Sequence, residues 1–217
     1  MNQPAETNER APVSTDAEAP PPAAGEEKAE GKPSLGSTVG ALARRIAPAQ
    51  SGEARGGWYL SNGERAELRR MRPEDPPPAV FWQLVADHLE PHLPAGDGPS
   101  RDGAERRWMV ILRAMAESAG RHDRGRPLGR ALAEARVAEP RLYQLLRARG
   151  DALVDQLRMA LHPVASRGLA FDQADVAWLV LTEGTEGGEA VRRRMARNYF
   201  QARRKLQQDP TETRSQP

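Results

Sequence analysis

Residues 189–208, EAVRRRMARNYFQARRKLQQ, show the helical pattern that runs through most of this chain. At about 100° per residue, the apolar side chains fall in one narrow stripe, made of Val191, Met195, Tyr199, Ala202 and Leu206. Arg193, Arg197 and Arg204 fall on the opposite face, and from Arg192 to Lys205 there are seven basic residues and no acidic one. The stretch therefore predicts a helix with an apolar inner face and a cationic outer face.

The helical period continues toward the N-terminus, without a convincing alternating strand pattern. Ser61 and Glu64 form a capping-box signature for a helix to about residue 71. Asp75 followed by Pro76 predicts a helix to about residue 92. Further helices are expected at 102–119, at 128–135, after Pro140, after an Asp151 cap, and from Asp172 and Asp175 onward. We therefore expect an all-α fold in residues 58–208, with two packed helical bundles at about 58–120 and 127–208.

The two ends of the chain have a different composition. Residues 1–57 are rich in Pro, Ala, Glu and Gly, and we expect a disordered tail there, with a transient helix at 39–46. Residues 209–217 are expected to form a second, short tail. Residues 1–38 carry a net charge of −4, so the rest of the chain, which totals +2, carries +6. The acidic tail therefore hides a basic domain.

Composition excludes several function classes. The chain has no cysteine, which removes disulfides, thiolate zinc sites and cysteine nucleophiles. No apolar run has the length of a transmembrane helix, and no signal peptide is evident. We expect a soluble, cytoplasmic protein without a membrane partner.

The candidate catalytic residues all have simpler structural interpretations. His88 and His92 have the four-residue spacing of metal ligands on a helix, but Pro91 intervenes and no third ligand is nearby. Asp172 and Asp175 are explained by helix capping, and the 184–188 segment lacks the lysine of a phosphate loop. No serine, histidine and acid arrangement is evident. We expect no catalytic residue, no metal and no cofactor.

Clustered arginines are the strongest functional signal. Residues 121–149 hold eight arginines against three acidic residues, and Arg65, Arg69 and Arg70 form a smaller group. A solvated helix face usually mixes charge signs, so a face of one sign indicates a partner of the opposite sign. The chain has 29 Arg and three Lys, and arginine suits nucleic-acid phosphates. Because a GC-rich genome also favours arginine, the clustering carries more weight than the abundance.

Two other interpretations remain open from the residues alone. Residues 128–149 have the spacing of a helix-turn-helix, whose second helix would present Arg141, Gln144 and Arg147 to the major groove of a duplex. That reading gives a DNA-binding transcription regulator. The other alternative is a scaffold whose arginines contact acidic proteins.

Several pieces together resemble a known family. They are LGRALA at 128–133, RLYQLLRA at 141–148, QLR at 156–158, the 63–70 segment with LRR, and the 171–200 segment that closes with RRRMARNYF. Their order and spacing resemble the CasB family, the small subunit of the type I-E CRISPR surveillance complex, Cascade. The resemblance covers about residues 58–205. The N-terminal tail is outside the family pattern, and the 184–188 turn lacks basic residues that some members carry.

The resemblance implies a non-catalytic subunit that lies beside the guide RNA and target DNA and stabilises the displaced strand of the R-loop. It also implies the backbone and large Cascade subunits as partners, and a second copy of the chain itself. Sequence would be read by guide–target pairing, so the protein needs only backbone contacts. The arginines expected to bind nucleic acid are Arg69, Arg70, Arg130, Arg136, Arg141, Arg147, Arg158, Arg193 and Arg197.

Overall fold

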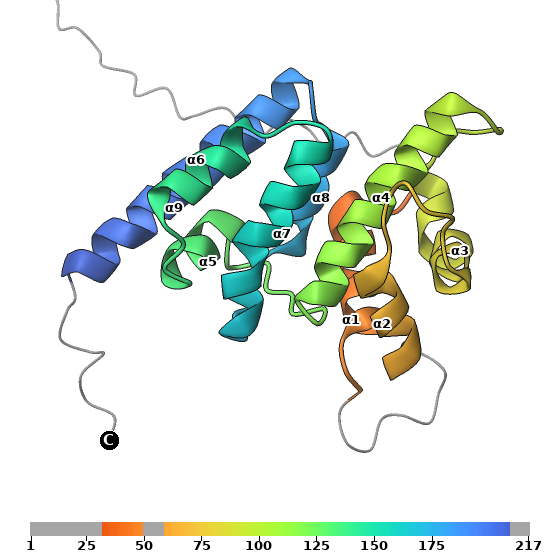
Figure 1. The fold of residues 1–217 in the computed structure, drawn as a ribbon, viewed down its shortest axis with the longest axis horizontal. Helices are drawn as coiled ribbons and strands as arrows, with labels where there is room; N and C mark the ends of the chain where they lie inside the picture. Colours follow the sequence, from red (N-terminus) through yellow and green to blue (C-terminus); the bar gives the residue numbers. More distant parts are fainter. Residues whose placement is uncertain (1–31, 50–58, 209–217) are drawn as a thin grey trace, which may run out of the picture. The chain divides into compact units, whose positions relative to one another are not determined.

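The computed structural model describes residues 32–49 and 59–208, and this part of the chain is all-α, as expected (Figure 1). The one β-type pairing in these residues is an isolated bridge between His122 and Phe171. The helices are α1 (Leu35–Ile46), α2 (Asn62–Arg70), α3 (Ala79–Leu84), α4 (Pro99–Glu117), α5 (Leu128–Glu134), α6 (Glu139–Arg147), α7 (Asp151–Ser166), α8 (Gln173–Leu181) and α9 (Glu186–Gln208). In these residues, no helix is both long and apolar enough to cross a membrane.

Helix α1 corrects the expectation of a tail at residues 1–57. It is a stable part of the core because Val39, Leu42 and Ile46 fall on one side and are fully buried. Two polar contacts also join α1 to the segment after α3: Thr38 Oγ1 lies 2.8 Å from His92 Nε2, and Arg45 pairs with Asp87 at 3.0 Å. The rest of the expected tails, residues 1–31, 50–57 and 209–217, lies outside the described residues, as does Trp58.

The residues around each start determine where the second and third helices begin. The Ser61 hydroxyl accepts the Glu64 N–H, and the Glu64 carboxylate accepts the Ser61 N–H, so the predicted capping box is confirmed. The expected helix start at Asp75 is wrong. A residue that precedes proline avoids the helical conformation, and residues 76–78 are three prolines. Helix α3 therefore begins at Ala79 and continues through a π-helical turn (Val85–Leu89) and a 3₁₀ turn (Glu90–His92).

Helix α4 runs through one continuous apolar core. Trp108, Ile111 and Met115 are fully buried in it. The helix contacts α2 from the N-terminal half, and α7 and α8 from the C-terminal half. The division into two bundles near residues 120–126 stays a prediction.

The C-terminal half is built around the pair α5 and α9, which make the most extensive helix contact of the described chain. Gly129 allows this close approach, because a Cβ atom there would overlap the backbone carbonyl of Met195. The side chains of Met195 and Tyr199 are buried beneath α5 and its neighbours, whereas Leu206, the last of the predicted stripe, is exposed. The predicted stripe is therefore confirmed up to the point where α9 extends beyond its partners.

Two features of the turns could not be expected from residue type alone. Arg136, between α5 and α6, has φ 56°, the left-handed conformation that usually selects glycine. Ala119, after α4, has φ 53°.

Asp151 is the first residue of α7 and makes no side-chain cap, so the expected Asp151 cap is wrong, and Gly150 occupies that position. Asp172 does cap α8, by accepting the Ala174 N–H at 3.0 Å.

Candidate nucleic-acid interface

Helices α6 and α9 lie side by side and run in opposite directions (Figure 1). At one end Arg203 pairs with Glu139 at 3.0 Å, and at the other Arg149 pairs with Glu189. Between these pairs, the rings of Tyr143 and Phe200 lie 6.3 Å apart. The ordered series of contacts fixes which residues of the two helices face outward together.

We call the outward residues along this seam the α6–α9 surface, which comprises Tyr143, Arg147, Arg193, Arg197, Phe200 and Arg204. All are exposed. The four arginines have no ion pair or hydrogen bond with any described residue. The nearest acidic groups on the two helices, Glu139 and Glu189, are each bonded to another arginine. The surface therefore presents four free guanidinium groups of one sign.

Arg192 shows that position along α9 decides the role of an arginine. Its side chain is buried, and it donates to the carbonyl oxygens of Leu146 and Ala148, both at 3.1 Å. These carbonyls lie at the C-terminal end of α6, where helical partners are lacking. Burial lowers the pKa of Arg192. This arginine is a structural cap, although the sequence counts it with the cationic face.

Among the other predicted arginines of the C-terminal half, some have no bonding partner in the described residues, and others bond to a carboxylate or a carbonyl oxygen. Arg136 is exposed in the turn before α6 and makes no ion pair within the described ranges. Arg130 pairs with Glu134 at 2.8 Å, and Glu134 also binds Arg126. Arg141 points toward α7, where it donates to the Met159 carbonyl at 3.5 Å. Exposed ion pairs contribute only about 0–1 kcal/mol, so Arg130 can exchange Glu134 for a phosphate at little cost.

Arg69 and Arg70 lie on another part of the molecule. Both are exposed in the last turn of α2, where the helix macrodipole favours cations. Helix α2 contacts α3 and α4. The structure does not bring these two arginines to the α6–α9 surface.

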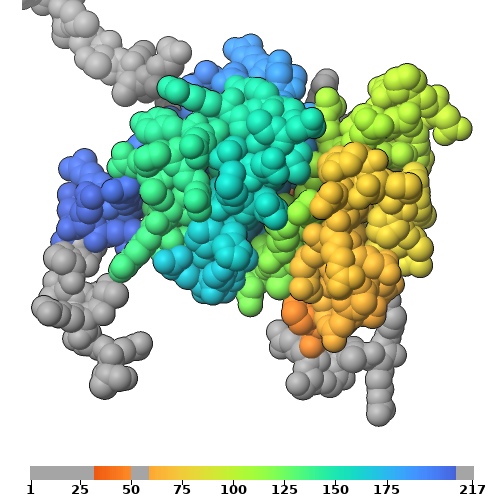
Figure 2. All heavy atoms as spheres, in the orientation of Figure 1, coloured from red at the N-terminus to blue at the C-terminus, as the bar shows by residue number. Residues whose placement is uncertain are grey.

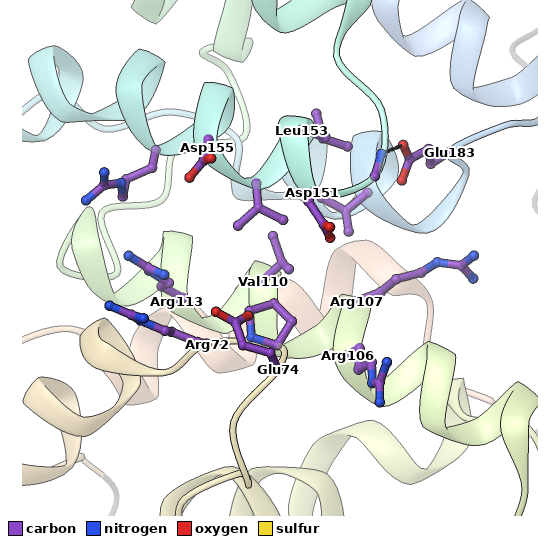
Figure 3. A pocket seen from close by; sticks show the side chains of 15 residues that line it. Arg72, Glu74, Arg106, Arg107, Val110, Arg113, Asp151, Leu153, Asp155 and Glu183 are labelled. Carbon is purple, nitrogen blue, oxygen red and sulfur yellow. Dashed lines mark hydrogen bonds between the residues drawn. The ribbon is translucent and has the colours of Figure 1, made fainter.

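Arg158 lines an open groove of about 790 Å³ between α4, α7 and the segment after α2 (Figure 3). Four further arginines line it that sequence reasoning did not select: Arg72, Arg106, Arg107 and Arg113. The adjacent arginines Arg106 and Arg107 form a basic pair in the sequence, which was the available signal for this group. The groove also contains four carboxylates, Glu74, Asp151, Asp155 and Glu183. Figure 3 shows Asp151, Asp155 and Glu183 on the wall opposite Arg72, Arg106 and Arg107.

Charge separates these two surfaces. The groove has five arginines against four carboxylates, a formal balance of +1. A phosphate backbone entering it would be attracted by one wall and repelled by the other. The α6–α9 surface has four unpaired arginines, and the carboxylates at its two ends, Glu139 and Glu189, are neutralised by Arg203 and Arg149. It is therefore the better candidate for a nucleic-acid interface, and Arg158 fits such a role less well than Arg147, Arg193 and Arg197. Figure 2 shows the atoms of α6 and α7, in green to cyan, at the face toward the viewer.

The histidines and acidic residues considered above as catalytic or metal-binding candidates make contacts that support the fold. His92 contacts Thr38 and the Trp108 ring. His88 is half-buried, and burial lowers its pKa. Asp175 caps α5 by accepting the Leu128 N–H at 2.8 Å, and it also pairs with Arg194. No group of three or more potential metal ligands is found in the part of the chain described here.

The family match covers the helices that carry these surfaces. Residues 64–200 match the family described as CRISPR-associated protein Cse2. The chain belongs to the Cse2 family. The match includes α2 to α8 and most of α9, so the CasB resemblance seen in the sequence is confirmed.

Two solved structures are similar to this Cse2-family chain. CasB from Thermus thermophilus has a TM-score of 0.55 and 27% identity, over 78% of this chain and 100% of that one. A chain of the crystal structure of E. coli Cascade bound to a PAM-containing double-stranded DNA target has a TM-score of 0.54 and 27% identity, over 76% and 95%. No curated protein sequence matches the chain.

Proposed function

We propose that this Cse2-family chain is a non-catalytic subunit of an RNA-guided CRISPR surveillance complex, Cascade, in antiviral defence. The observation that carries the proposal is its likeness to a chain of E. coli Cascade bound to a DNA target, which extends over 95% of that chain. In such a complex the protein binds the backbone of guide RNA and target DNA and stabilises the displaced strand. The one-sign α6–α9 surface supports this role.

Backbone contacts are sufficient for that task. R-loop formation exchanges a DNA duplex for an RNA–DNA duplex of nearly equal stability. A few phosphate contacts can therefore decide whether the R-loop persists. Each contact to a single strand releases counterions and contributes about −0.7 to the slope of log K against log salt. Arg147, Arg193, Arg197 and Arg204 supply up to four such contacts.

The proposed partners include the backbone and large subunits of the complex and a second copy of this chain. The mixed-charge groove suits a protein partner better than a phosphate backbone, because its carboxylates would repel phosphate. Charged groups of both signs can be matched by complementary charges on another subunit. The proposal thus assigns different ligands to the two surfaces.

The test is reconstitution of the complex with R147Q/R197Q, compared with wild type. The control is R121Q/R167Q, which removes the same charge from two exposed positions outside both surfaces. We expect the first variant to be incorporated but to shorten R-loop lifetime and to reduce the salt slope by about 1.4. The control should retain the wild-type slope. Unchanged target-DNA affinity at moderate salt, with R147Q/R197Q incorporated, would contradict the proposal.

The purified chain alone separates the two other interpretations. A helix-turn-helix regulator would bind one duplex sequence tightly and discriminate against random fragments. The proposed subunit should bind weakly, with strong salt dependence and without sequence preference. A scaffold for acidic proteins would co-purify with its partners in the absence of nucleic acid. Gel shifts with random and genomic fragments, and affinity purification with analysis of bound RNA, distinguish these outcomes.

A further inference from the structure

An exposed aromatic pair lies in the middle of the α6–α9 surface. Tyr143 is 47% exposed and Phe200 is 37% exposed. Their rings are 6.3 Å apart at an interplanar angle of 46°. Neither ring belongs to the apolar face that α9 buries, since that face is occupied by Val191, Met195 and Tyr199. Core packing therefore does not account for this pair.

The pair is held in place from below. Phe200 packs edge-on against Tyr199, with ring centroids 5.2 Å apart at 87°. The buried Tyr199 hydroxyl donates to the Val137 carbonyl at 2.6 Å and accepts from Arg203 at 3.0 Å. Arg203 also bridges to Glu139 on α6. These contacts fix the helices that carry the two rings, so little ordering is needed when a ligand binds.

Phe200 also lies within a row of arginines. Arg193, Arg197, Phe200 and Arg204 follow one another at helical spacings of four, three and four residues, so they share a face. At 1.5 Å per residue the row spans about 16 Å. That length corresponds to about five nucleotides at a stacked rise of about 3.4 Å. Cations thus flank the aromatic pair on both sides along α9, and Arg147 flanks it on α6.

We propose that Tyr143 and Phe200 stack on unpaired bases of a single nucleic-acid strand while the neighbouring arginines hold its phosphates. This inference rests on the proposed function and specifies the strand that the surface takes. A duplex covers the faces of its bases, whereas a single strand offers them to aromatic side chains. A basic groove combined with aromatic side chains is the usual construction of such sites. The two carboxylates at the ends of the surface, Glu139 and Glu189, are already paired with Arg203 and Arg149, so its four unpaired arginines favour phosphate over a protein partner of mixed charge.

The test compares two ten-nucleotide strands of equal charge, oligo-dT and the same backbone without bases, by fluorescence anisotropy with the full chain at low salt. We expect wild type to bind oligo-dT roughly 10-fold tighter than the abasic strand. The Y143L/F200L variant should lose this difference and keep the wild-type affinity for the abasic strand. The control W82L removes an exposed aromatic side chain on α3 and should change neither affinity.

Other results would distinguish a failure of base stacking from a failure of the proposed function. Equal binding of both strands by wild type, or an equal loss for both strands in Y143L/F200L, overturns stacking and leaves the backbone function intact. Unchanged strand binding combined with failed incorporation into the complex makes the pair a protein contact and also overturns it. If R147Q/R197Q leaves both affinities unchanged, the proposed function itself fails. Should the double variant lose helical content, Y143L alone provides the same comparison.

Discussion

Adjacent arginines in α9 have opposite roles. Arg192 is buried and binds two carbonyl oxygens at the end of α6, whereas Arg193 is exposed. A hydrogen bond to a charged group contributes about 1.5–3 kcal/mol, and removal leaves buried acceptors unsatisfied. We expect R192A to lower the free energy of unfolding by about 2–4 kcal/mol. R193A should change it by less than about 0.5 kcal/mol and weaken strand binding. Urea unfolding measures both, and equal losses would contradict the assignment.

Two glycines in helices make a similar contrast. A Cβ atom at Gly129 would overlap the Met195 carbonyl, while one at Gly103 in α4 meets no atom within 4 Å. We expect G129A to separate α5 from α9 and to destabilise the protein by about 1–3 kcal/mol, the usual cost of overpacking. G103A should stabilise by up to about 1 kcal/mol, since alanine favours the helix. Thermal unfolding of the two variants provides the measurement. A stabilised G129A would show that the helices can move apart freely.

At the scale of elements, α1 is joined to the rest of the domain partly through a titratable group. His122 is half-buried beside Gly40 of α1, and its Nδ1 accepts the Gln173 N–H at 3.2 Å. Burial lowers the pKa of His122 below its ordinary 6.5. The charged groups that also act on it are Asp172 and Asp123, which raise that pKa, and Arg124 and Arg44, which lower it.

The sign of the resulting pH dependence follows directly. Below pH 6.5 the unfolded chain takes up a proton that folded His122 resists, so stability falls as the pH falls through that range. Above it the histidine is neutral in both states, and its contribution is constant. We expect H122Q to lose less stability than wild type between pH 7 and 5.5 in urea unfolding. H162Q, on the exposed side of α7, should behave as wild type. An unchanged pH dependence in H122Q would contradict the role of this histidine.

The elements that could be predicted are those specified by local chemistry. Ser61 and Glu64 define the start of α2 by themselves, and Asp172 does so for α8. Only a transient helix at 39–46 was expected in place of helix α1. Its apolar residues are few and lie within a Pro- and Gly-rich segment, and they are stabilised by α8, α4 and the turn after α3, all distant in sequence. The start of α3 was predicted wrongly because the Asp75–Pro76 signal was read without the two prolines that follow it.

The candidate site was partly predictable for the same reason. Helical spacing places Arg193 and Arg197 on an outer face without knowledge of the fold. The pair of Arg130 with Glu134 lies within α5 at i,i+4 spacing, so the sequence contained that signal. The hydrogen bonds of Arg192 depend on contacts between helices, which a single helical pattern does not contain. The pairing of Tyr143 with Phe200 also required the antiparallel placement of α6 and α9.

At the scale of the whole described domain, the core is continuous. Buried side chains of α4 contact the C-terminal helices, and α1 packs on α8. We therefore expect residues 33–208 to unfold in a single cooperative transition. In a variant that retains only the buried Trp108 of α4, the urea midpoint by fluorescence should equal the midpoint by circular dichroism, which follows the helices of both halves. Two separated midpoints would instead support independent bundles that divide near residues 120–126.

The left-handed backbone conformation at Arg136 lowers the stability of the protein, while the Arg136 side chain supplies a charge for the proposed strand binding. A non-glycine residue in this conformation costs roughly 1–2 kcal/mol, so R136G should raise the melting temperature while it removes a charge beside α6. The same left-handed conformation occurs at Ala119, and A119G would relieve its cost without loss of charge. If strand binding weakens only in R136G, the protein retains a conformational penalty in order to keep a cation at that corner. Selection for thermal robustness alone would then drive this chain toward a better-folded and less effective subunit.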